Sequence, residues 1–225
     1  MKLQNIDADH HSLRLCEGSD TLVVSFEGIR LTEWIWPEVA SRYDLHWLNL
    51  HDPEDRYAFP GIAGFSNDVE DTSAKIIDIA EALAVERLVV LGYSSGATSA
   101  IIHGYLTEAD HVLAINPRIL ADAATRKRMG DVRRTSATDD TLAHPLCFPE
   151  YRDFNTLFAA SVGTTYDIYY SALHRADKLL QQYVRDYDCV TYYPMQESRH
   201  ALWKVMMRDN AFYPVVEKAI FPKRS

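Results

Sequence analysis

The stretch Leu91-Gly92-Tyr93-Ser94-Ser95-Gly96-Ala97 decides the fold of this chain. It follows an apolar run at Arg87–Leu91, typical of a buried parallel strand, and it precedes helical spacing at Ser95–Tyr105. The pattern Gly-x-Ser-x-Gly between a strand and a helix predicts a sharp turn that lifts its serine above the end of a sheet. Ser94 is therefore a candidate nucleophile.

The residues on either side of Ser94 have the types that such a turn requires. Because the chain reverses so sharply, the positions two residues before and after the serine must lack bulk, and Gly92 and Gly96 stand there. The N–H of Ser95 begins the following helix, whose dipole favours a developing negative charge. A glycine-rich turn that only packs is the alternative, and the strand–turn–helix setting favours the catalytic interpretation.

Short apolar runs alternate with helical spacing on both sides of this turn. We expect strands at Thr21–Phe26, Leu45–Leu50, Arg87–Leu91, His111–Ile115, Tyr166–Tyr170 and Cys189–Tyr193. We expect helices at Asp68–Leu83, Ser95–Tyr105, Ala172–Val184 and Ala201–Met207. This alternation predicts an α/β fold with a doubly wound, mostly parallel sheet of about six to seven strands.

The segment 117–165 does not follow that alternation. It contains helix-prone and turn-like sequence, including Pro145 and Pro149, but no clear strand. A connection of that length is more than a loop. We therefore expect a single domain over residues 1–225, in which 117–165 forms a helical cap or a lid.

These features resemble the α/β-hydrolase superfamily, and the resemblance runs from about Thr21 to Trp203. In that superfamily the nucleophile, the acid and the histidine follow one another along the chain. His200 stands after the last expected strand and just before a helix, so the resemblance implies that it is the general base. A surface histidine is the alternative, and the other eight histidines lack that position.

Asp177 is the acid that the resemblance implies, because it follows the strand expected at Tyr166–Tyr170. Asp167 lies inside that strand, and Asp188 lies at the opposite end of the sheet. An aspartate that only caps or pairs with the following helix is the alternative role for Asp177. Ser171-Ala172 stands where a glycine often follows this strand, which is a departure from the superfamily's pattern.

The resemblance also implies an oxyanion hole made by two backbone N–H groups. The Ser95 N–H is one donor, and the loop with Gly28 and Ile29 supplies the other. Glu27 occupies the position at which a histidine is often found. A plain turn is the alternative for this loop.

The function implied is that of a serine hydrolase that cleaves a carboxylic ester or thioester through Ser94, His200 and Asp177. Two alternatives stay open: acyl transfer by the same residues to an alcohol such as a sugar hydroxyl, and a catalytically idle binding or scaffold protein. Some small members of the superfamily accompany polysaccharide or glycoprotein export machinery. Since one expected strand precedes Gly28, a sheet that lacks an opening strand or two is also expected.

Composition excludes several other classes. Acidic residues outnumber basic ones by 32 to 23, for a net charge of −9, which argues against nucleic-acid binding. The cysteines, Cys16, Cys147 and Cys189, are too few and too widely spaced for a disulfide scaffold or a zinc site. No cofactor motif is present, so the chemistry is expected to need no cofactor. The polar N-terminus and the absence of a long apolar segment predict a cytoplasmic protein that does not span a membrane.

Two side-chain clusters are open to a binding role. Six basic residues lie between Arg118 and Arg134, where they could recognise a phosphate or carboxylate, although the solvated face of a helix is favoured. Aromatic residues gather at Tyr151–Phe158 and Tyr166–Tyr170, where packing is favoured over an acyl pocket. The expected ligand is a small-molecule or glycan-linked acyl substrate, and the oligomeric state does not follow from the sequence.

Overall fold

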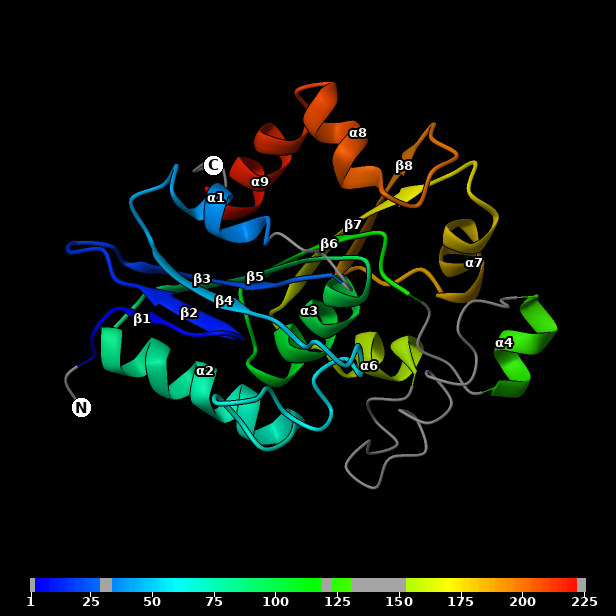
Figure 1. Ribbon diagram of the computed structural model, residues 1–225. Coiled ribbons are helices and arrows are strands. Elements are labelled where there is room, and N and C mark those ends of the chain that lie inside the picture. The colour runs from blue at the N-terminus through cyan, green and yellow to red at the C-terminus, as the bar shows by residue number, and fades with distance from the viewer. Residues whose placement is uncertain (1–2, 29–33, 119–122, 131–152, 222–225) are drawn as a thin grey trace.

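A computed structural model describes residues 3–28, 34–118, 123–130 and 153–221. Its centre is one eight-stranded sheet in the order β1-β2-β4-β3-β5-β6-β7-β8 (Figure 1). The strands are β1 (Ile6–Asp7), β2 (His11–Arg14), β3 (Thr21–Phe26), β4 (His46–Leu50), β5 (Arg87–Tyr93), β6 (His111–Ile115), β7 (Thr165–Ser171) and β8 (Val190–Met195). Every pairing from β4 to β8 is parallel, which confirms the predicted doubly wound sheet.

The sheet has more strands than the sequence predicts. β1 pairs with β2, and β2 with β4, in antiparallel register, so the prediction that opening strands are missing is wrong. Both residues of β1 are exposed and the four residues of β2 alternate between buried and half-buried. Neither strand has the continuous apolar run by which the six predicted strands are recognised.

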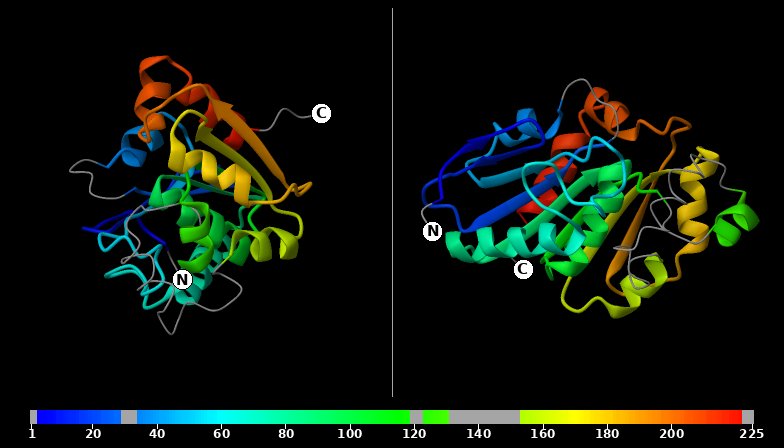
Figure 2. Two further views of the ribbon diagram at one scale, coloured as in Figure 1. Left: turned by 90° about the vertical axis from the view of Figure 1, so that its right-hand side faces the viewer. Right: turned by 60° about the horizontal axis from the view of Figure 1, so that its bottom comes forward.

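Helices cover both faces of the sheet. The helices of the described residues are α1 (Trp36–Ala40), α2 (Val69–Leu83), α3 (Ser95–Leu106), α4 (Ala123–Met129), α6 (Phe154–Ala160), α7 (Arg175–Tyr183), α8 (Leu202–Arg208) and α9 (Phe212–Ile220). α2, α3 and α6 share one apolar core, and α1, α8 and α9 share the other, on the upper face in Figure 1. Figure 2 shows α2 and α3 side by side across the first face.

The central strand β5 separates the two cores. Val90 packs into the core under α3, whereas Val89 and Leu91 pack into the core under α8 and α9, as the alternation of side chains along a strand requires. All three side chains have no exposed surface. The carboxyl end of β5, where Ser94 follows, is thus held rigidly from both faces.

The predicted cap falls largely outside the described residues. Within the described part of 117–165, α6 packs against the sheet through Phe154, Leu157 and Phe158, all of which are buried. The ring of Phe158 meets that of Tyr166 edge-on, with 4.8 Å between centroids, so these aromatic residues pack in the core. The cap itself stays a prediction. None of the helices in the described ranges is long and apolar enough to cross a bilayer.

Candidate functional site

Ser94 occupies a strained turn at the carboxyl end of β5. Its backbone has φ 55° and ψ −121°, a region that side-chain-bearing residues rarely adopt. Its N–H donates to the carbonyl of Ile115, 2.8 Å away, which ties the turn to β6. Strain of this kind persists where the surrounding structure enforces it, and it places the Ser94 side chain at the edge of the sheet.

The glycines around Ser94 are required by close backbone contacts. A Cβ atom on Gly92 would lie 2.2 Å from the carbonyl oxygen of Gly96, and one on Gly96 would lie 2.3 Å from that of Phe26. No rotation of a side chain relieves a contact with backbone. The sequence pattern is therefore explained by the packing of the turn itself.

His200 lies next to Ser94, as the sequence predicts. Its Nε2 atom is 2.9 Å from Ser94 Oγ, and it is brought there by the segment between β8 and α8. The carbonyl of His200 accepts a hydrogen bond of 2.5 Å from Asn116 Nδ2, which fixes the backbone that carries the ring.

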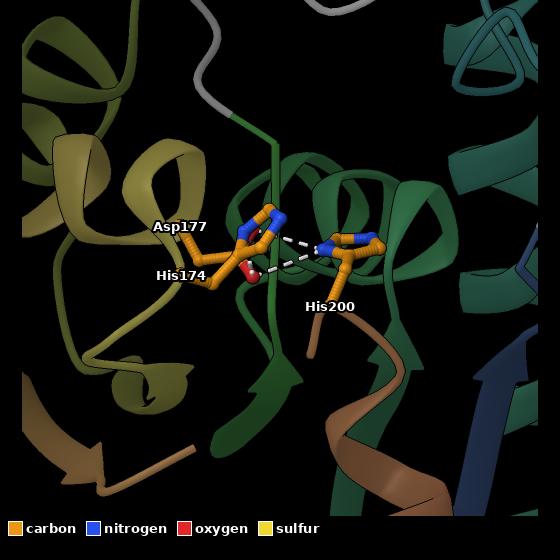
Figure 3. Close-up of side chains that lie close together, drawn as sticks. All are labelled: His174, Asp177 and His200. Carbon is orange, nitrogen blue, oxygen red and sulfur yellow. Dashed lines mark hydrogen bonds and ion pairs between the residues drawn. The ribbon is translucent and has the colours of Figure 1, made fainter. Parts of the chain in front are cut away.

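Asp177 completes a line of three contacting side chains. Its Oδ1 and Oδ2 atoms lie 2.8 and 3.1 Å from His200 Nδ1 (Figure 3). Ser94 contacts the other nitrogen of that ring, Nε2. The Asp177 side chain has no exposed surface. The neighbouring aspartate Asp167 lies elsewhere, where its Oδ2 accepts from Lys218 Nζ at 2.8 Å. Of the candidates that the sequence offers, Asp177 is the one placed beside His200.

A second histidine, which the sequence analysis missed, also contacts Asp177. His174 Nδ1 lies 2.8 Å from Asp177 Oδ2, and the His174 and His200 rings are 5.7 Å apart between centroids (Figure 3). His174 precedes α7 and Asp177 is in its first turn, so the two side chains lie on one face. The spacing of three residues between a histidine and the candidate acid is the signal that could have found it.

Ser171 has a structural role that explains the departure from glycine after β7. Its hydroxyl donates to the carbonyl of Arg199 at 2.7 Å, and its N–H donates to Asn116 Oδ1 at 2.8 Å. Asn116 has a left-handed backbone with φ 51° and is buried. Ser171 and Asn116 together pin the segment that bears His200 to the ends of β6 and β7.

Of the two predicted oxyanion donors, Ser95 lies within the described residues, whereas the loop with Gly28 and Ile29 is described only as far as Gly28. Ser95 is the first residue of α3, where N–H groups have no intrahelical acceptor. A Cβ at Gly28 would lie 2.4 Å from the Tyr93 ring, so Gly28 packs closely against that ring. Ile29 lies outside the described residues. The loop thus begins in close contact with the residue that precedes Ser94.

Glu27 is a buried carboxyl that ties this loop to the turn. It accepts hydrogen bonds from the Trp36 N–H at 2.9 Å and from the Tyr93 hydroxyl at 3.0 Å. Burial raises the pKa of Glu27 to about 7, although the hydrogen bonds from Trp36 and Tyr93 act in the opposite direction. The histidine expected at this position is thus replaced by an acid that links both sides of the loop.

Glu27→Gln is expected to remove a pH dependence of stability. The native pKa of about 7 exceeds the ordinary glutamate pKa of 4.5, so the folded state holds the proton more tightly and the free energy of unfolding falls as pH rises through that window. The fall attributable to Glu27 amounts to about 3 kcal/mol. Urea unfolding at pH 5 and pH 8 measures it, with the exposed Glu38→Gln as control. Equal pH slopes for wild type and Glu27→Gln would contradict the assignment.

A small cavity opens beside Ser94 and His200. Its volume is about 180 Å³. The described residues that line it are Tyr93, Ser94, Ile115, Asn116, His200, Ala201, Leu202, Trp203 and Lys204. A larger cavity of about 1010 Å³ lies at the opposite edge of the sheet, beside the amino ends of β5, β6 and β8, away from Ser94. Chemistry at Ser94 therefore concerns the smaller space.

The basic residues of the sequence do not form a single anion site in the part of the chain that the structure describes. Arg118 pairs with Asp55, with 3.1 Å between Nη1 and Oδ2, and both residues are largely buried. Arg126 is buried in α4, whereas Lys127 and Arg128 are exposed. Arg133 and Arg134 lie outside the described residues. The predicted solvated helix face therefore holds for Lys127 and Arg128 but not for the buried Arg126.

Comparison with known proteins finds similarity of structure alone. No family model matches the chain, and no curated protein matches it by sequence. The capsule O-acetyltransferase of Neisseria meningitidis serogroup A is similar over 95% of this chain and 93% of its own, with a TM-score of 0.60 and 10% identity. A lipase-esterase related protein from Clostridium acetobutylicum is similar over 94% and 99%, with a TM-score of 0.57 and 12% identity.

A third similar structure is a chain of the Glycosylation Associate Protein (Gap123) complex from Streptococcus agalactiae. It is 20% identical, with a TM-score of 0.61 over 98% of this chain, which spans about half (47%) of that longer chain. At these identities the comparisons establish the fold. The described chain has the fold of the α/β-hydrolases, as the resemblance in the sequence predicts.

Proposed function

We propose that this chain, which has the α/β-hydrolase fold, is a serine hydrolase that cleaves a short-chain carboxylic ester or thioester. The observation that carries the proposal is the unbroken line of contacts from buried Asp177 through His200 to Ser94 on a strained turn. A nucleophile, a base within hydrogen-bond reach and a third group that orients the base are what acyl transfer by serine requires.

The first half of the reaction forms an acyl-enzyme. The Ser94 hydroxyl donates its hydrogen bond to His200 Nε2, 2.9 Å away, and its oxygen attacks the acyl carbon as His200 takes the proton. Asp177 accepts the hydrogen bond of His200 Nδ1–H and stabilises the imidazolium. When the tetrahedral intermediate collapses, His200 gives the proton to the departing alcohol or thiol, and the acyl group stays on Ser94.

The second half releases the acid. His200 takes a proton from water, whose oxygen attacks the acyl carbon, and the ester bond to Ser94 breaks as Ser94 Oγ regains a proton. The Ser95 N–H, at the start of α3, donates to the oxyanion in both halves. Each such donor lowers the barrier by roughly 3–4 kcal/mol. We place the second donor in the loop after Gly28, with Ile29 as the candidate.

The cavity beside Ser94 favours a small acyl group. It holds about 180 Å³, and its apolar lining comes from Ile115, Leu202 and Trp203. Lys204 lies at the same cavity, where its ammonium group is 5.2 Å from the centre of the Trp203 ring. An acetyl-sized group fits such a space, while the amphipathic rim of Trp203 and Lys204 suits a polar leaving group or acceptor.

Acyl transfer to a sugar hydroxyl is the second candidate. It is favoured by the similarity to the capsule O-acetyltransferase of N. meningitidis over nearly the full length of both chains. The same residues serve, because a hydroxyl replaces water in the second half of the reaction. The similarity to the Gap123 chain motivates a third possibility, a binding protein without turnover.

Hydrolysis of 4-nitrophenyl esters of increasing chain length tests the proposal. We expect the acetyl ester to be the fastest and the octanoyl ester to be slower by tenfold or more, because the cavity is small. Adding a soluble glycan and measuring acetylated sugar separates transfer from hydrolysis. A folded protein that turns over none of these esters, with or without glycan, would favour the binding role.

A further inference from the structure

Three metal-ligating side chains converge behind the His200 ring. Ligand atoms of His174, Asp177 and His200 all lie within 4.8 Å of one another (Figure 3). Asp177 Oδ2 is 2.8 Å from His174 Nδ1 and 3.1 Å from His200 Nδ1. The line of contacts to Ser94 accounts for Asp177 and His200 but gives no role to His174.

The separation of these atoms fits a tetrahedral ion. Zinc bound at 2.0–2.1 Å by imidazole nitrogens and a carboxylate oxygen has ligand atoms roughly 3.3 Å apart. The two separations from Asp177 Oδ2 need to grow by only a few tenths of an ångström, whereas the two histidine nitrogens, which lie within 4.8 Å of each other, must come closer by up to about 1.5 Å. Two histidines, one carboxylate and one open position form a ligand set that zinc takes in proteins.

The backbone holds two of the ligands in place before any ion binds. The His174 carbonyl accepts hydrogen bonds from the N–H groups of Asp177 and Lys178, at 3.2 and 3.0 Å, so the residue before α7 is tied to the first turn of the helix, which carries Asp177. Asp177 is fully buried, and a buried carboxylate is best compensated by cationic partners. The backbone that carries these two ligands is thus set before an ion binds.

The surroundings of the His174 Nδ1 atom also favour a bound ion. It is buried, and no described group meets it in hydrogen-bond geometry, although the Asp177 carboxylate is 2.8 Å away. A buried ring nitrogen without an aligned partner is costly. An ion between the ring and the carboxylate satisfies that nitrogen.

We propose that His174, Asp177 and His200 bind one Zn²⁺ and that the bound ion switches the site off. Zinc at His200 Nδ1 takes the lone pair of that nitrogen, so the remaining ring proton resides on Nε2, facing Ser94. His200 then donates to Ser94 and has no lone pair with which to take its proton. The inhibition rests on the proposed function of Ser94 and His200, whereas the binding of zinc does not.

Calorimetric titration with zinc chloride tests the binding without any turnover. Ser94→Ala is expected to bind one Zn²⁺ per chain, and adding His174→Asn is expected to weaken that binding about tenfold or more, because one of three ligands is lost. Asparagine keeps a polar group near Asp177 but supplies no imidazole. The matched control adds His51→Asn, since the His10 and His51 rings, 5.9 Å apart, offer the competing imidazole pair.

The outcomes separate the two proposals. The proposed site is overturned if Ser94→Ala binds no zinc. It is also overturned if Ser94→Ala and the double variant with His174→Asn, both folded by circular dichroism, bind zinc with equal affinity. In the wild type, zinc should stop ester hydrolysis, and a chelator should restore it; binding without inhibition would overturn the switch. If the wild type turns over no ester, the proposed function fails while calorimetry still decides the zinc site.

Discussion

His200→Ala is expected to lower kcat for the preferred ester by about 10⁶-fold, the loss that removing the base of a serine hydrolase produces. The reason is the single contact of 2.9 Å between His200 Nε2 and Ser94 Oγ, without which the serine proton has no nearby base. Initial rates with purified variants measure the effect.

The loss should not add to that of Ser94→Ala. Residues that act as a unit are strongly non-additive, so the double variant is expected to be no slower than either single one. His103 provides the control histidine: it is buried in α3, where its Nδ1 atom lies 2.8 Å from the hydroxyl of Ser73. A His200→Ala enzyme that keeps more than a hundredth of the wild-type kcat, or a His103→Gln enzyme that loses as much, would contradict the role of His200.

Asp177→Asn is expected to lower kcat by about 10⁴-fold, as the equivalent change does in a serine protease triad. The carboxylate accepts the His200 Nδ1–H and keeps the Nε2 lone pair towards Ser94. An amide nitrogen in its place donates to Nδ1 instead, and the ring then presents its proton to the serine. The effect should fall on kcat with little change in KM.

Asp167→Asn is the matched control for that variant. Asp167 is also a largely buried aspartate next to a histidine, since its carboxylate lies 3.8 Å from His111 Nε2, but it lies near the amino end of β7, away from Ser94. Its loss should affect stability more than kcat. Comparable losses of kcat for the two variants would refute the assignment of Asp177 as the orienting acid.

The parts of the fold that the sequence predicts are those with strong local signals. The strands at Thr21–Phe26 and His111–Ile115 have the predicted bounds, and the bounds of β5, β7 and β8 differ from prediction by one or two residues. β3, β5, β6 and β7 are mostly buried, whereas the residues of β8 are half-buried or exposed. The positions of Ser94 and His200 after strands make them candidates from the sequence, and the structure brings their side chains into contact. Local pattern and strand order are enough to predict candidate side chains that stand directly after the carboxyl ends of parallel strands.

The features that the sequence did not reveal depend on contacts between distant segments. β2 is recognisable as a strand only when it pairs with β4, whose Leu48 and Leu50 lie opposite its Leu13 and His11. Ser171 looks like a deviation until its hydroxyl is seen to hold the Arg199 carbonyl. His174 becomes a candidate ligand only because the fold brings the His200 ring to 5.7 Å from it, between centroids. Short polar strands and shared partners leave little trace in local periodicity.

Covalent labelling of Ser94 tests the central claim most directly. A fluorophosphonate forms a bond between Ser94 Oγ and phosphorus as fluoride departs and His200 takes the serine proton, so only an activated serine reacts. Intact-protein mass spectrometry should show one adduct per chain, mapped by peptide analysis to Ser94 and absent from Ser94→Ala and His200→Ala. A folded wild-type protein that stays unlabelled, or that is labelled at another residue, would contradict the account.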